Sequence, residues 1–136
     1  MPDNRVISYC TEDMTRPSHI LFRPPAEAES VIIRVADGCP WNQCAFCGMY
    51  TGVSYRVHTE REIRAAIVDG CRRWPDARRV FLADGDVMAL PFAVLMDILA
   101  MLAAALPRLA RVNLYANGRS IQMKSDDELR TLSARG

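Results

Sequence analysis

Residues 31–47 read VIIRVADGCPWNQCAFC, a short apolar run that leads directly into three cysteines. The run at 31–35 is almost continuously apolar and rich in β-branched residues, which is typical of a buried strand in a parallel sheet. The residues that follow, 36–58, contain several glycines, a proline and an asparagine, and read as a loop. The stretch therefore predicts a buried strand whose carboxyl end opens into a cysteine-bearing loop.

A helix is predicted after this loop. Thr59 and Glu62 have the spacing of a capping box, in which each side chain bonds the backbone amide of the other residue. Pro75 ends the helix, because proline cannot continue the backbone hydrogen bonding. Apolar positions recur every three or four residues and predict one buried face. This predicted face consists of Ile63, Ala66, Ile67, Gly70, Cys71 and Trp74.

A second strand–helix unit comes next. Residues 80–83 form another short apolar run, and the Asp-Gly-Asp turn at 84–86 ends it. Residues 91–107, with a proline at each end, have the periodicity of a helix. Its predicted buried side consists of Leu95, Leu99, Leu102 and Leu106.

The third unit follows the same order. Residues 112–115 form a third predicted strand, which continues into the polar stretch Tyr-Ala-Asn-Gly-Arg at 115–119. Ser125 and Glu128 form a second capping box, which opens a helix that runs to Gly136. Strands that alternate with helices predict right-handed crossovers and a parallel sheet, so the fold class is α/β.

The domain organisation follows from this count of strands. Residues 1–29 are polar and broken by prolines, and we interpret them as an irregular N-terminal arm. A closed eight-stranded barrel takes about 250 residues, and only three strands are predicted here. We therefore interpret residues 30–136 as the N-terminal part of a larger, TIM-barrel-like core, although a minimal α/β domain is the alternative.

Composition narrows the function classes. The 136 residues carry a formal net charge of +1, and half of them are hydrophobic. Near-neutral charge with scattered arginines gives no indication of a nucleic-acid partner. No apolar run approaches the roughly 20 residues that span a bilayer. We predict a cytoplasmic protein without a membrane partner, in a compartment where thiols stay reduced.

The three cysteines at 39, 44 and 47 have several possible roles. A disulfide leaves one of the three unpaired, and a reducing compartment disfavours it. The spacing Cys44-x-x-Cys47 matches thioredoxin-type motifs, but those lie at a helix N-terminus, whereas a glycine and a long loop follow here. A structural zinc site needs a fourth ligand. The candidates for that ligand are Cys10, His58 and Cys71.

An iron–sulfur cluster is the fourth possibility. Cys71 falls on the predicted apolar helix face and His58 directly precedes a helix cap, so ordinary structural roles explain both. A cluster held by three thiolates needs no fourth protein ligand and leaves one iron open for a small molecule. The cysteine loop also follows the carboxyl end of a strand, where α/β folds place their active sites.

In this cysteine pattern the chain resembles the radical S-adenosylmethionine enzymes. The family usually places three residues between its first two cysteines and two before the third, with an aromatic residue directly before the last. Here four residues separate Cys39 from Cys44, two separate Cys44 from Cys47, and Phe46 is the aromatic. The longer spacing resembles that of an uncharacterised bacterial group in the family. The Asp-Gly-Asp turn at 84–86 stands where the family has a Gly-Gly-Glu-like motif.

This resemblance implies a cofactor and a reaction. The three cysteines would bind a [4Fe-4S] cluster, and its open iron would bind S-adenosylmethionine for reductive cleavage to methionine and a 5′-deoxyadenosyl radical. Contacts to S-adenosylmethionine would come from Phe46, Asp84, Gly85 and Asp86. Catalytic activity would need an electron donor such as a flavodoxin or ferredoxin. No residue indicates the small-molecule or macromolecular substrate.

Two alternatives stay open. The Asp-Gly-Asp turn at 84–86 is also an ordinary connection into a helix N-terminus, which favours acidic residues. The Asn-Gly at 117–118 is likewise an ordinary turn signal. The chain as a whole could be a non-catalytic zinc or iron–sulfur module, or an α/β interaction domain with incidental cysteines.

Overall fold

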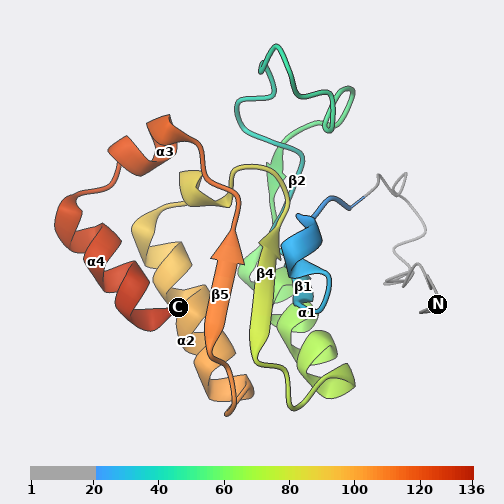
Figure 1. Cartoon of the computed structure of the whole chain (residues 1–136), viewed down its shortest axis with the longest axis vertical. Coiled ribbons are helices and arrows are strands. Elements are labelled where there is room, and N and C mark those ends of the chain that lie inside the picture. Colours follow the sequence, from blue (N-terminus) through green and yellow to red (C-terminus); the bar gives the residue numbers. More distant parts are fainter. Residues whose placement is uncertain (1–20) are drawn as a thin grey trace.

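The computed structural model describes residues 21–136, and its three predicted strands form one parallel sheet (Figure 1). These strands are β1 (Val31–Arg34), β4 (Arg79–Ala83) and β5 (Arg111–Leu114). Their order in the sheet, β1-β4-β5, is their order in the chain, and both pairings are parallel. The α/β class with a parallel sheet is therefore confirmed, and these strands do not close into a barrel.

Two helices connect the strands. They are α1 (Glu60–Arg73) and α2 (Phe92–Ala105), and α4 (Asp126–Arg135) follows β5 and packs against α2. Because the strand order does not reverse, right-handed crossovers place successive helices on the same face of the sheet. Figure 1 shows α1 and α2 together behind the strands.

The sequence signals for the helix ends are confirmed. The Thr59 hydroxyl accepts from the amide of Glu62, and the Glu62 carboxylate accepts from the amide of Thr59 at 2.7 Å. Ser125 and Glu128 form the same reciprocal pair at the start of α4. Such caps satisfy amides that have no partner within the helix.

The core lies between the sheet and its helices. It contains alternate residues of the strands, such as Val80 and Leu82, together with the helix positions Ile63, Ile67 and Leu102. Burying one such side chain contributes about 1.5–3 kcal/mol. Gly70 lies where α1 crosses β1, and a β-carbon there would come within 2.8 Å of the Ile33 side chain.

One predicted core position is wrong. Trp74 is 47% exposed, although the periodicity of the helix placed it on the buried face. The helix ends at Arg73, and Trp74 is its C-cap with a non-helical backbone (φ −134°, ψ 66°). The side chain therefore leaves the direction that the helical period predicts. Cys71, one turn earlier, is partly buried against the core as predicted.

The other face of the sheet has no helix over it within residues 21–136, apart from the short turn η1 (Pro25–Glu27). Phe81 points to this side, where its ring meets Tyr115 edge to face with 5.1 Å between centroids. The buried carboxylate of Glu27 accepts hydrogen bonds from Ser30 and from the Asn113 amide of β5. Part of the segment expected to be irregular is thus tied to the sheet.

Several short elements were not predicted. Inside the cysteine loop, β2 (Ala36–Asp37) and β3 (Arg56–Val57) pair antiparallel. After β4 and β5 come η2 (Val87–Ala89) and α3 (Gly118–Gln122). Such elements are too short to show a period in the sequence.

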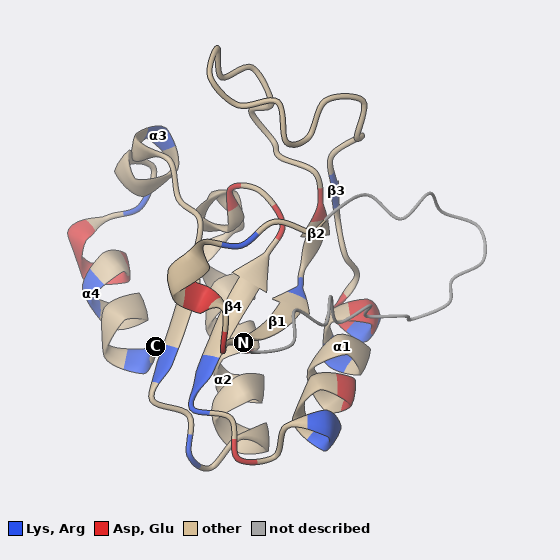
Figure 2. Cartoon of the chain, turned by 45° about the vertical axis from the view of Figure 1, so that its right-hand side comes forward, with Lys and Arg blue, Asp and Glu red and all other residues tan. Residues whose placement is uncertain are grey.

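The surface charges follow the predicted pattern. Acidic and basic residues are intermixed along α1 and α4 (Figure 2), as on a solvated helix face. Within residues 21–136, no helix has the length and apolar character that crossing a membrane would require.

Candidate functional site

Three chain segments meet at the carboxyl edge of the sheet. The cysteine loop rises from β1 through β2 and returns through β3, the Asp-Gly-Asp turn follows β4, and α3 follows β5. Figure 1 shows the cysteine loop standing above this edge, with α3 beside it. Parallel strands bring their carboxyl ends together, which is why segments far apart in sequence meet here.

The three cysteines lie on this loop as free thiols. Cys39, Cys44 and Cys47 are each partly exposed, and none is in a disulfide. The amide of Cys47 donates to the carbonyl of Cys44 at 3.2 Å, which makes a tight turn between the second and third thiols. Among residues 21–136, no three His, Cys, Asp or Glu side chains come close enough together to hold a metal ion.

The residues weighed as a fourth zinc ligand have other surroundings. His58 Nε2 lies 3.0 Å from an Asp37 carboxylate oxygen at the base of the loop. Cys71 lies on α1 and packs against the hydrophobic core, and burial raises the pKa of its thiol. Cys10 lies outside the described residues.

An ion-pair network closes the base of the loop. Arg56 donates from two guanidinium nitrogens to the two carboxylate oxygens of Glu62, at 3.0 and 3.1 Å, and from Nε to Asp37 at 3.2 Å. The hydrogen bonds from Arg56 lower the pKa of Glu62 to about 2. Burial opposes ionisation of Asp37, but its bonds to His58 and Arg56 outweigh this and lower its pKa. The Arg56 guanidinium thus joins β3 to α1 through these ion pairs.

Tyr50 anchors the middle of the cysteine loop to the Asp-Gly-Asp turn at 84–86. Its side chain is 2% exposed, and its hydroxyl accepts from the amide of Gly85 at 2.8 Å and donates to Asp84 at 3.2 Å. Burial is the main reason that the pKa of this hydroxyl is raised far above its ordinary value. The hydroxyl therefore stays protonated and can donate to the carboxylate.

Asp84 is the most buried acid of the site, at 1% exposure. Its second carboxylate oxygen lies 3.7 Å from Arg34 Nε, a buried nitrogen that makes no hydrogen bond in the described part of the chain. Unpaired charge is costly to bury, so the Arg34 guanidinium and the Asp84 carboxylate are electrostatic partners at this end of β1. The predicted cofactor residue Asp84 is thus in contact with β1 and with the cysteine loop.

Gly85 makes a close backbone approach. Its φ of +48° favours glycine, and an added β-carbon would lie 2.3 Å from the carbonyl oxygen of Gly38 and 2.7 Å from Cα of Cys39. The family resemblance implies that this glycine contacts the cofactor. In the structure, the space beside it holds the backbone that leads into the first cysteine.

Asp86 connects the turn to α3. One oxygen of its carboxylate accepts from the amide of Asn117 at 3.3 Å, and the other accepts from the hydroxyl of Ser120. Asn117 in turn caps α3 by accepting from the amide of Ser120 at 2.9 Å. The carboxylate expected to contact the cofactor thus already bonds to the start of α3.

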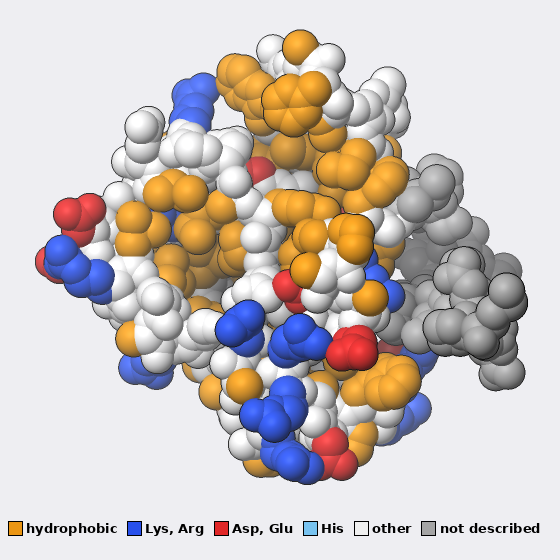
Figure 3. All heavy atoms as spheres, in the orientation of Figure 1, with side chains coloured by type: hydrophobic (Ala, Val, Ile, Leu, Met, Phe, Trp, Pro, Cys, Tyr) orange, Lys and Arg blue, Asp and Glu red, His pale blue; other side chains and the backbone are white. Residues whose placement is uncertain are grey.

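The outer surface of the site is apolar. Phe46 is 93% exposed, and Trp41, Tyr55 and Met123 are also exposed at this edge. The guanidinium of Arg119 on α3 lies 5.6 Å from the ring centroid of Trp41, so this contact spans the cysteine loop and α3. Hydrophobic side chains gather over the cysteine loop at the top of Figure 3.

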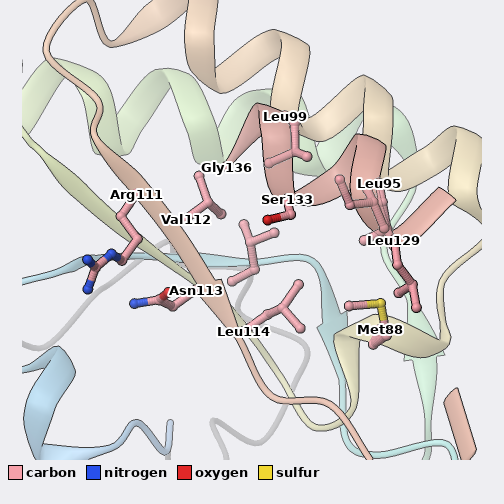
Figure 4. Close-up of a pocket in the computed structure, with 12 residues that line it drawn as sticks. Met88, Leu95, Leu99, Arg111, Val112, Asn113, Leu114, Leu129, Ser133 and Gly136 are labelled. Carbon is pink, nitrogen blue, oxygen red and sulfur yellow. The ribbon is translucent and has the colours of Figure 1, made fainter. Parts of the chain in front are cut away.

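Two hollows lie elsewhere on the molecule. One of about 370 Å³ is enclosed by β5, α2 and α4, with Leu99, Leu114 and Leu129 on its walls (Figure 4). The other, of about 350 Å³, lies between η1 and the end of α1. Neither hollow is lined by a predicted site residue.

Sequence reasoning missed Ser120 and Arg34 as parts of the site. Ser120 lies 34 residues from Asp86 in sequence, and Arg34 reads only as an interruption of an apolar strand. An arginine inside an otherwise buried strand was the one available signal for a buried acid nearby.

Comparisons with protein-family models, with curated proteins and with solved structures found no match for this chain.

Proposed function

We propose that Cys39, Cys44 and Cys47 bind a [4Fe-4S] cluster and that the chain is the N-terminal part of a radical S-adenosylmethionine core. The observation that carries the proposal is the position of three free, partly exposed thiols on one loop at the carboxyl edge of a parallel sheet. Thiolates on a flexible loop are the ligands that such clusters take.

The donor set fits this group in kind, number and accessibility. No three side chains within residues 21–136 converge on a single metal ion, but a [4Fe-4S] cluster takes each thiolate on a different iron, and the loop would adjust around it. Metal binding commonly supplies the free energy for such local folding. The exposed tip of the loop, with Phe46 at 93% exposure, has few contacts to break when it closes.

The neighbouring acidic turn gives the second argument. Asp84 and Asp86 are buried carboxylates that follow the adjacent strand, and Gly85 between them touches the Cys39 backbone. The amino group of S-adenosylmethionine, if it is bound beside Cys39, would therefore lie near the carboxylates of Asp84 and Asp86. In a TIM barrel all helices lie on the outer side of the strands, and α1 and α2 likewise lie on one face of this sheet.

With S-adenosylmethionine bound, the cluster would supply the electron for cleavage to methionine and a 5′-deoxyadenosyl radical. This chain's residues would bind the cluster, orient the cofactor and exclude side reactions. A flavodoxin- or ferredoxin-type donor in the cytoplasm, and a small-molecule or macromolecular substrate, belong to the same proposal.

A non-catalytic metal module is the second candidate, and one observation favours it. Both oxygens of Asp86 already accept bonds from α3, and the Gly85 space is filled by the loop backbone. The Asp-Gly-Asp turn is then a structural connection, and zinc or a cluster would serve as a staple.

Anaerobic reconstitution with iron and sulfide, followed by reduction and electron paramagnetic resonance, separates the two. We expect a [4Fe-4S]⁺ signal that changes when S-adenosylmethionine is added. The triple variant Cys39→Ser, Cys44→Ser, Cys47→Ser should lose the signal, whereas Cys71→Ala should keep it. A signal indifferent to S-adenosylmethionine, or bound zinc in place of iron, would establish the metal module instead.

A further inference from the structure

Both ends of the cysteine segment 39–50 are attached to the same turn. At its start, the backbone of Gly38 and Cys39 lies against Gly85 so closely that no β-carbon fits between them. At its end, the Tyr50 hydroxyl bonds both Gly85 and Asp84. The segment is therefore a closed loop whose two ends meet at Asp84–Gly85.

Tyr50 is the one buried residue of this segment, every position of which the structure describes. The remaining positions, including the thiols, are exposed or half-buried. Phe22 supports the ring from the side, edge to face at 6.0 Å between centroids. The exit of the loop is thus anchored through a buried side chain, whereas its entry is anchored through backbone packing.

Asn42 folds the segment back onto that anchor. It has a left-handed backbone (φ 45°), and its side-chain amide donates to the Tyr50 carbonyl at 2.9 Å. Cys44 and Cys47 lie between these two bonded residues. The Tyr50 anchor therefore sets the position of the small inner loop that carries the second and third thiols, relative to Cys39.

We propose that Tyr50 is a positioning residue for the metal site, which fixes the inner loop on the Asp84–Gly85 turn so that Cys44 and Cys47 stay within reach of Cys39. This inference rests on the proposed function for the identity of the bound group. Its physical basis is loop-closure entropy: an unanchored exit leaves more chain to order when three thiols converge on one group. Residues that orient metal ligands without touching the metal typically change affinity about 10- to 100-fold.

The test uses Tyr50→Phe, which keeps the ring and removes the two hydroxyl bonds. Ser54→Ala is the control, because it removes an exposed hydroxyl four residues after Tyr50. Each full-length variant is reconstituted with iron and sulfide, and the release of iron to a chelator is followed by the loss of cluster absorbance. Urea unfolding of the metal-free variants, measured in parallel, shows whether each chain is folded under the release conditions.

We expect cluster release from folded Tyr50→Phe to be at least about ten-fold faster than from wild type, with Ser54→Ala unchanged. Release at the wild-type rate from folded Tyr50→Phe would overturn the inference and leave the proposed function standing. A wild-type chain that assembles no cluster would instead remove the proposed function.

In that case cadmium, a thiolate-binding ion, is titrated into the same variants and followed by its thiolate absorbance. Weaker cadmium binding by Tyr50→Phe than by Ser54→Ala would support the positioning role without the cluster. Equal binding would overturn it. Should Tyr50→Phe fail to fold, Asn42→Ala takes its place, with the same expected direction, because it releases the inner loop from Tyr50 while the hydroxyl bonds stay.

Discussion

On the helix-covered face of the sheet, apolar side chains from successive strand–helix units pack together, and each unit's own periodicity shows which residues they are. At the carboxyl edge, the loops are joined by hydrogen bonds between residues 31 to 35 positions apart, such as Tyr50 to Gly85 and Asp86 to Asn117. Packing on the helix-covered face is spread over many apolar contacts, whereas the edge relies on a few specific hydrogen bonds. We therefore expect changes on the helix-covered face to alter the free energy of unfolding, and changes at the edge to alter ligand binding as well.

The largest expected effect is on the packed face. Leu102→Ala removes a side chain with no exposed surface, and we expect the free energy of unfolding to fall by about 2–5 kcal/mol. Urea unfolding monitored by circular dichroism measures this loss. The control is Val68→Ala on α1, which is 59% exposed and should stay within about 0.5 kcal/mol of wild type. Equal effects of the two variants would mean that the face does not pack as described.

Gly85→Ala tests the contact between the acidic turn and the cysteine loop. The new β-carbon would collide with backbone at 2.3 Å, and the positive φ adds its own cost, so we expect a loss of about 1–3 kcal/mol. Gly52→Ala is a matched control, since its φ is +77° and no atom lies within 4 Å of the added carbon. The difference between the two variants, from urea unfolding, isolates the close approach.

Identical losses for these two variants would contradict the contact. The same pair of variants also separates an effect on folding from an effect on metal binding. Gly85→Ala should weaken metal loading of the cysteine loop beyond its effect on unfolding, whereas Gly52→Ala should leave loading unchanged.

The smallest effect concerns the base of the cysteine loop and depends on pH. The pKa of Glu62 is held at about 2, below its ordinary value of 4.5, because Arg56 donates to the ionised carboxylate. A depressed pKa means that this stabilisation is fully present above pH 4.5 and is lost as the pH falls through about 2. Glu62→Gln keeps a capping acceptor for Thr59 but removes the charge. We expect it to cost about 0.5–1 kcal/mol at pH 7, because solvent screens a pair this exposed.

Urea unfolding of wild type and Glu62→Gln at pH 7 and at the lowest pH where both fold measures this difference. The gap between the two curves should shrink as the pH falls. A gap that is the same at pH 7 and at a pH well below 4.5 would show that the ion pair contributes nothing. Arg64→Gln, which breaks an exposed pair with Glu60 on the outer side of α1, is the control with little expected effect at either pH.

Much of the fold could be predicted because its signals are local. Short apolar runs marked the three strands, and the reciprocal pairs at Thr59 and Ser125 marked two helix starts. Trp74 was placed wrongly because the helical period was carried one residue past the end of α1. The β2–β3 pair and α3 were missed because two to five residues show no period.

The candidate site divides in the same way. The places of the thiols and of the acidic turn could be predicted from the sequence, because both follow strands of a parallel sheet and such strands end at one edge. Their contacts could be seen only in the folded chain: Gly85 lies against Cys39, Tyr50 bonds the acidic turn, and Asp86 holds the start of α3. The physical reason is that a hydrogen bond between distant segments leaves no periodic trace in either one. It depends on how the whole sheet brings the two segments together.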